Sequence, residues 1–140
     1  MRFVSVFYGE LDRRGGLLYG NAGHTSGLVI GRNSVMHLDP TGPIMGPLPD
    51  MPLERGYVHI PVGSILALYT DGITERVNPD GTPFEVEGLT ALIQKYRDRS
   101  ASEIVWQVFN HVLELDHESD MIEDDMTLVI LKHTGENADS

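Results

Sequence analysis

Short segments in which apolar residues alternate with polar ones, or run together, fill the first third of the chain, a pattern typical of β-strands. The first segment, residues 3–12, is rich in aromatic and β-branched side chains. Glycine-containing turns separate it from three further segments, at residues 17–23, 27–31 and 35–38. Apolar runs joined by such turns form antiparallel hairpins, so the pattern predicts a β-meander up to Leu38.

A proline-rich stretch follows, with five of the eight prolines between residues 39 and 52. Proline fixes φ and lacks an amide donor, so this stretch is predicted to be an ordered loop. Residues 54–60 form the next expected strand. After a turn, the apolar residues 65–69 predict a largely buried strand that ends at Thr70-Asp71-Gly72.

Helical spacing of apolar residues appears only later, first over residues 87–97. A second helix is expected after Ser100 or Ser102, and Ser100 with Glu103 fits a capping box. Its expected apolar stripe is Ile104, Val105, Val108, Phe109, Val112, Leu113 and Leu115. A last strand is predicted at residues 126–131. Clustered strands followed by helices predict an α+β fold with a mostly antiparallel sheet, one domain over residues 1–134 and a polar tail at 135–140.

The composition narrows the class of partner. The 140 residues carry 21 acidic and 10 basic side chains, a net charge of −11, which argues against nucleic-acid backbones and anionic membranes. No cysteine is present, so disulfides and thiolate metal sites are excluded. No apolar run approaches the ~20 residues of a membrane span, and the N-terminus lacks the pattern of a signal peptide. We therefore expect a cytoplasmic protein.

Asp71 is the first candidate for chemistry. It follows a strand predicted to be buried and precedes a glycine that lets the backbone turn away. A carboxylate in such a place is fixed yet open to solvent, and hard cations such as Mg²⁺ bind one or two such carboxylates. The alternative is an ordinary Asp-Gly turn.

Asp124 and Asp125 lie at the entrance of the last predicted strand. If that strand is the antiparallel neighbour of residues 65–69, its entrance lies beside the exit that carries Asp71. Converging carboxylates repel one another unless a cation lies between them or one is protonated. A divalent metal held by Asp71 and Asp124 accounts for this pattern, and a solvated acidic loop is the alternative.

Four motifs occur in the order and spacing of one family: Asn21-Ala22-Gly23-His24, Gly42-Pro43-Ile44-Met45-Gly46, Tyr69-Thr70-Asp71-Gly72-Ile73-Thr74-Glu75 and Asp124-Asp125-Met126-Thr127. In these motifs the chain resembles the catalytic domain of bacterial metal-dependent serine/threonine phosphatases of the stage II sporulation protein E and sigma-regulation type. These enzymes are relatives of protein phosphatase 2C. The resemblance extends over residues 2–132.

The resemblance implies an αββα sandwich with a two-metal Mn²⁺ or Mg²⁺ centre between the sheets. Asp71 and Asp124 take the positions of direct metal ligands and so of the catalytic carboxylates. The resemblance places Asp125 beside a ligand, where eukaryotic relatives carry Asn. Further candidates near the metals are Gly72, Glu75 and His24, the last with a structural hydrogen bond as the alternative.

Two departures from the family pattern stand out. The family carries an additional Asp-Gly pair, whose carboxylate bridges both metals, in the first half of the domain, and nothing before Phe3 supplies it. We therefore expect the chain to be the C-terminal part of a longer domain, with little activity alone and with exposed sheet surface that favours a homodimer. Relatives often have Phe-Gly where this chain has Phe84-Glu85, so the resemblance does not predict the backbone of that loop.

The complete enzyme is expected to hydrolyse phosphoserine or phosphothreonine on a protein, by family an anti-sigma-factor antagonist, with a metal-activated water and no covalent intermediate. The rival from another class is a noncatalytic pseudo-phosphatase module that keeps the sheet and has lost the metals. A receiver-like phosphoacceptor role for Asp71 would need alternating strands and helices, which the order of elements does not offer.

Overall fold

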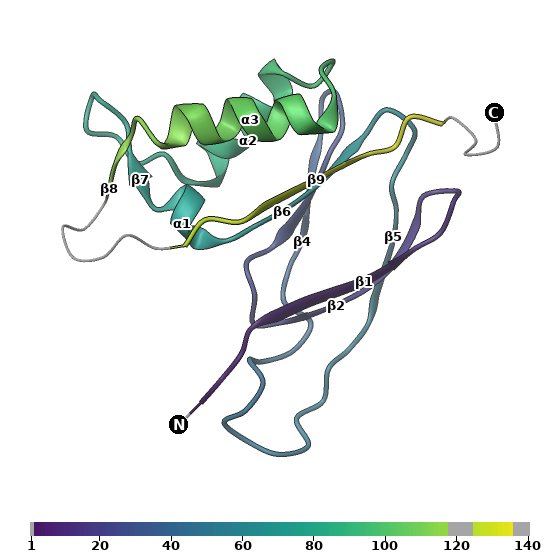
Figure 1. Cartoon of the computed structure of the whole chain (residues 1–140). Helices are drawn as coiled ribbons and strands as arrows, with labels where there is room; N and C mark the ends of the chain where they lie inside the picture. Colours follow the sequence, from purple (N-terminus) through teal and green to yellow (C-terminus); the bar gives the residue numbers. More distant parts are fainter. Residues whose placement is uncertain (1, 118–124, 136–140) are drawn as a thin grey trace. The chain divides into compact units, whose positions relative to one another are not determined.

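The computed structural model describes residues 2–117 and 125–135 (Figure 1). The chain divides into two compact units. Unit 1 comprises Met1–Leu66 and Lys132–Ser140, and unit 2 comprises Ala67–Leu131. The boundaries fall within strands β6 (Ile65–Tyr69) and β9 (Leu128–Lys132), so both units contribute to these two strands.

Unit 1 contains a three-stranded antiparallel sheet in the order β1-β2-β5. Its strands are β1 (Val6–Leu11), β2 (Gly16–Ala22) and β5 (Gly56–His59). The β1–β2 turn is closed by Asp12, whose Oδ1 accepts the backbone N–H groups of Arg14 at 2.8 Å and Gly16 at 2.9 Å. The expected hairpin over residues 3–23 is confirmed, with β1 three residues shorter at its start.

The predicted meander is wrong at its third strand. Strand β3 (Gly27–Ile30) pairs with β4 (Val35–Leu38), whereas β2 pairs with β1 and β5. The buried Asn21 redirects the chain, because its side-chain amide donates to the carbonyls of Thr25 and Leu38 and accepts the N–H of His24. These bonds fold residues 21–25 into a compact turn, from which β3 leaves for a different sheet.

The same asparagine holds the proline-rich loop. The backbone carbonyl of Asn21 accepts the N–H groups of Thr41 and Gly42, and the Gly42 carbonyl accepts the N–H of Gly23 at 3.0 Å. Gly23 has φ +63°, and a Cβ there would lie 2.2 Å from Cγ2 of Ile44. The motifs that begin at Asn21 and at Gly42 are therefore two halves of one packed structure.

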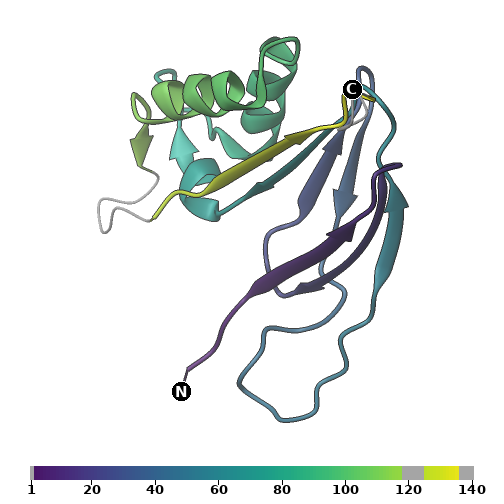
Figure 2. The same cartoon turned by 45° about the vertical axis from the view of Figure 1, so that its right-hand side comes forward.

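Unit 2 contains the helices. Its elements between β6 and β9 are α1 (Asp71–Thr74), β7 (Arg76–Val77), α2 (Glu85–Lys95), α3 (Ala101–Val112) and β8 (Asp116–His117). Helices α2 and α3 lie beside each other in both views (Figures 1 and 2). The fully buried aliphatic side chains of α1, α2 and α3 are Ile73, Leu89, Ile93, Ile104, Val108 and Val112. The expected α+β class with antiparallel sheets is confirmed.

The expected helix cap is confirmed at Ser100, whose Oγ accepts the N–H of Glu103 at 3.2 Å. The predicted apolar stripe holds for the first three turns of α3, but Leu113 is 63% exposed at the end of the helix. No helix among residues 2–117 and 125–135 is both long and apolar enough to cross a bilayer.

Glu85 has an unusual backbone conformation, with φ +51° at the first position of α2. The preceding Phe84 is buried, and its N–H donates to the Arg76 carbonyl at 2.8 Å. The Phe84 ring covers Gly88, where a Cβ would lie 2.3 Å from it. The chain must therefore turn sharply at Glu85 to begin the helix, through a left-handed conformation that glycine adopts more easily.

Candidate functional site

Thr70 joins the end of β6 to the segment that enters β9, within unit 2. Its N–H donates to the carbonyl of Thr127 at 3.1 Å, and its Oγ1 accepts the N–H of Thr127 at 2.9 Å. The same hydroxyl donates to the carbonyl of Asp125 at 3.2 Å. The sheet order also makes β6 and β9 neighbours, so the predicted adjacency of these strands is confirmed.

Asp71 follows directly as the first residue of α1 and is exposed. Its backbone carbonyl accepts the N–H of Glu75 at 2.8 Å and the hydroxyl of Thr74 at 3.3 Å, so the main chain around it is fixed. Within the described part of the chain, no hydrogen bond occupies the Asp71 carboxylate. A fixed backbone that carries a solvent-facing carboxylate suits a metal ligand.

The other predicted residues of unit 2 differ in accessibility. Asp125 is exposed, and its backbone is one hydrogen bond from Thr70. Glu75 is exposed at the end of α1. Gly72 is buried, and its carbonyl accepts Nε of Arg76 at 3.1 Å, which uses one of its two lone pairs. Asp124, a predicted direct ligand, lies outside the described residues.

His24 belongs to unit 1 and not to the unit that carries Asp71. Its ring is partly buried, and Nδ1 lies 2.9 Å from Oγ of Ser5. Its backbone N–H is bonded to the side chain of Asn21 at 2.8 Å. The structural hydrogen bond that was the alternative to metal ligation is thus present in the structure.

The donor chemistry of the site fits a hard divalent cation, because its side chains are carboxylates. Among residues 2–117 and 125–135, no three His, Asp or Glu side chains gather closely enough to hold a metal ion. Asp71 and Asp125 lie on segments joined through Thr70, so two of the predicted site residues belong to neighbouring segments. The role of Asp124 as the partner ligand stays a prediction.

Most of the acidic residues of the chain belong to unit 2. Unit 2 carries 14 of the 21 acidic residues and 4 of the 10 basic residues. An excess of one charge creates a potential that raises the local concentration of ions of the opposite sign. Cation binding in unit 2 is therefore favoured over binding of a free anion.

A hollow lies in unit 1. It has a volume of about 320 Å³ and is lined by Tyr8, Glu10, Leu18, Tyr19, Gly20, Leu53 and Arg55. Oε1 of its carboxylate, Glu10, accepts the hydroxyl of Tyr8 at 2.6 Å. None of the candidate metal ligands lines this hollow, so the hollow is not part of the candidate site.

The role of Thr70 was not predicted. The sequence placed it beside Asp71 in a motif, but only the structure shows its hydroxyl bonded to both Asp125 and Thr127. A hydroxyl residue directly after a buried strand and directly before a carboxylate is the sequence signal that could have pointed to these hydrogen bonds.

The sequence of this chain was compared with protein-family models and with known proteins. Residues 1–134 match the family model described as stage II sporulation protein E (SpoIIE). The phosphoserine phosphatase RsbU of Bacillus subtilis is 27% identical over 133 residues, which cover 93% of this chain and 39% of RsbU.

Solved structures show the same relationship. The RsbU and RsbW domains of Rv1364c from Mycobacterium tuberculosis superpose with a TM-score of 0.63 and 26% identity, over 87% of this chain and 34% of that one. The phosphatase domain of SpoIIE from Bacillus subtilis, presoaked with Mn, gives a TM-score of 0.66 at 18% identity, over 95% of this chain and 58% of that one. This chain thus spans only part of each relative, and its fold is that of their PP2C-type phosphatase domains. By the match over residues 1–134, the chain belongs to the SpoIIE family.

Proposed function

We propose that this chain is part of a metal-dependent protein phosphatase that hydrolyses phosphoserine or phosphothreonine. The observation that carries the proposal is a set of three hydrogen bonds, two donated and one accepted by Thr70, which join the segment before Asp71 to the segment that follows Asp124. Membership of the SpoIIE family and similarity to a phosphoserine phosphatase support the reaction class.

Asp71 and Asp124 would hold the metal through their carboxylates. Glu75, Asp125, the Gly72 carbonyl and His24 are the further candidates near it. A bound Mn²⁺ or Mg²⁺ supplies an activated water and neutralises charge on the phosphoryl group. Thr70 fixes the spacing of the two ligand-bearing segments, and α1 holds the Asp71 backbone in place.

The proposed substrate is a phosphorylated protein, by family an anti-sigma-factor antagonist in the cytoplasm. Similarity to RsbU and to the RsbU domain of Rv1364c supports this assignment. A phosphate group and unit 2 have charges of the same sign, so long-range electrostatic attraction does not bring them together. We therefore expect unit 2 to recognise the phosphoprotein through other contacts.

A noncatalytic module is the second candidate. Such a module would keep the fold and the Thr70 contacts but would not depend on a divalent cation.

The test is phosphate release from a phosphoserine peptide by the full-length protein during titration with Mn²⁺. We expect turnover that requires Mn²⁺ and is lost in Asp71→Asn, while Glu87→Gln, an exposed carboxylate on α2, keeps wild-type turnover. Turnover without any divalent cation, or Asp71→Asn with full turnover at saturating Mn²⁺, would contradict the proposal. No turnover at any Mn²⁺ concentration would favour the noncatalytic module.

A further inference from the structure

Arg76 has a buried guanidinium, with only 4% of the residue exposed. It lies in β7, directly after α1 and Glu75. Its Nε donates to the carbonyl of Gly72 at 3.1 Å, and its Nη2 lies 3.0 Å from Sδ of Met126. Because arginine stays charged, its burial costs several kcal/mol unless the group is hydrogen-bonded, and these two contacts are among those that compensate the cost.

Two of the contacts of Arg76 reach the two segments that carry the candidate ligands. Gly72 follows Asp71, and Met126 follows Asp125. We propose that Arg76 is a positioning residue of the metal site, which holds the α1 turn against residues 125–127. The existence of a metal site rests on the proposed function, whereas the contacts of Arg76 come from the structure alone.

The backbone of Arg76 is itself fixed. Its carbonyl accepts the N–H of Phe84 at 2.8 Å, and β7 pairs with β8 in the register Arg76↔His117. The side chain therefore starts from an anchored strand and reaches both segments from one place. At the end of β6, Thr70 also hydrogen-bonds the segment after Asp124. The two segments are therefore connected twice, once through Thr70 and once through Arg76.

Arginine is suited to this role in a way that lysine is not. The guanidinium directs its five donors along fixed, diverging directions, whereas a lysine ammonium is a single point at the end of a flexible stem. In Arg76 the Nε and Nη2 groups use two of these directions to reach two different segments. Arg76→Lys keeps the positive charge but cannot make both contacts at once. The variant therefore distinguishes an effect of the hydrogen-bond geometry from an effect of the charge.

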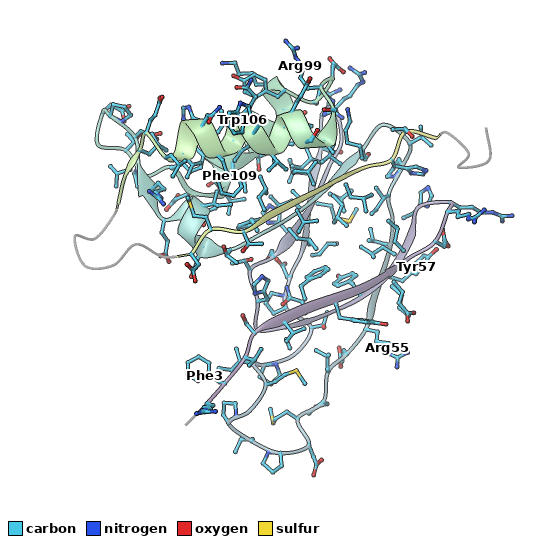
Figure 3. All side chains as sticks on the ribbon, in the orientation of Figure 1. Phe3, Arg55, Tyr57, Arg99, Trp106 and Phe109 are labelled. Carbon is cyan, nitrogen blue, oxygen red and sulfur yellow. The ribbon has the colours of Figure 1, made fainter. Side chains whose placement is uncertain are left out.

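The experiment uses the metal-free chain and compares Arg76→Lys with Arg99→Lys. Arg99 is exposed and extends away from the turn between α2 and α3 (Figure 3). Amide hydrogen exchange is measured at Glu75, whose N–H is bonded to Asp71, and at Thr127, whose N–H is bonded to Thr70. We expect Arg76→Lys to exchange about tenfold faster at both amides and to bind Mn²⁺ about 10- to 100-fold more weakly, the usual cost of losing an outer-shell partner. Arg99→Lys should match the wild type.

Met126→Leu is the second variant. It removes the sulfur that Arg76 contacts, while the charge of Arg76 and nearly all of the side-chain volume at position 126 are kept. It should raise exchange at Thr127 and leave the α3 amides unchanged. Exchange raised equally in α3 by both variants would assign Arg76 to general stability and overturn the inference, as would wild-type exchange in both. If the full-length wild type binds no Mn²⁺, the proposed function fails, while the exchange measurements on this chain still decide whether Arg76 positions the turn.

Discussion

Thr70 and Thr127 form two hydrogen bonds with each other, one from each backbone N–H. The N–H of Thr70 donates to the Thr127 carbonyl at 3.1 Å, and the N–H of Thr127 donates to the Thr70 hydroxyl at 2.9 Å. This pair sets the distance between the end of β6, where Asp71 begins α1, and the acidic segment that leads into β9. The candidate site depends on it.

Thr70→Val should weaken this junction, because valine has the same shape without the hydroxyl. The exposed N–H of Thr127 and the exposed carbonyl of Asp125 would each lose a protein partner, and a hydrogen bond of this kind contributes about 0.5–1.5 kcal/mol net to the free energy of unfolding. Thr70→Ser keeps the hydroxyl and serves as the matched control. Chemical denaturation of the three proteins measures the effect, and equal stability of the valine and serine variants would contradict it.

Glu85→Gly should stabilise the protein. Glu85 has φ +51°, and a left-handed conformation costs a non-glycine residue roughly 1–2 kcal/mol. Glycine also makes the unfolded chain more flexible, which offsets part of this stabilisation. We therefore expect the free energy of unfolding to rise by about 0.5–1 kcal/mol. Glu87→Gly, in the first turn of α2, is the control and should destabilise by about 1 kcal/mol. Thermal melting of both variants checks the prediction, and a lower melting temperature for Glu85→Gly would refute it.

Asp12→Asn should change how stability depends on pH. Backbone hydrogen bonds from Gly16 and Arg14 hold the pKa of the Asp12 carboxyl below its ordinary value of 3.8. Since the folded pKa is lower than the unfolded one, the stabilisation is complete above the unfolded pKa and disappears as the pH falls through the folded pKa. Urea unfolding between pH 3 and pH 7 should show the wild type more stable than Asp12→Asn at pH 7, with the difference shrinking below about pH 4. A difference that stays constant with pH would argue against the role of these bonds.

The chain should self-associate, most simply as a symmetric dimer. Strands β1 and β5 are the outer strands of the unit 1 sheet, and large apolar side chains are exposed in that unit, among them Phe3 at 64% and Tyr57 at 70% (Figure 3). Open strand edges and apolar surface favour pairing, while the charge of −11 limits larger aggregates. Light scattering over a concentration series should show a dimer that Tyr57→Lys weakens. A monomer at every concentration would show that these surfaces do not associate.

Much of the fold could be predicted because long periodic segments dominate their own local structure. The strand at residues 65–69 and the cap at Ser100 follow from apolar runs and from hydroxyl chemistry. Three elements could not be predicted, since α1, β7 and β8 contain four, two and two residues, too few for any period to show. The meander failed at Asn21, whose buried hydrogen bonds override the local pattern.

The candidate site was predictable to a similar extent. The adjacency of β9 to the strand that precedes Asp71 follows from carboxylates at two strand ends, while the role of Asp71 as a ligand stays a prediction. The roles of Thr70 and Arg76 could not be predicted, because both depend on contacts with residues at least 50 positions away along the chain. Local sequence gives no sign that an arginine will be buried between such distant segments.

The central claim is that Asp71 and Asp124 share one divalent cation, and a double-mutant cycle on Mn²⁺ binding tests it most directly. Calorimetric titration would compare the wild type with Asp71→Asn, Asp124→Asn and the double variant, with Glu87→Gln as control. Groups that hold the same ion act as a unit, so their effects on binding are not additive. We predict that either single substitution removes most of the Mn²⁺ affinity and that the second adds little. Losses that add independently, or Mn²⁺ binding that neither substitution alters, would contradict the shared site.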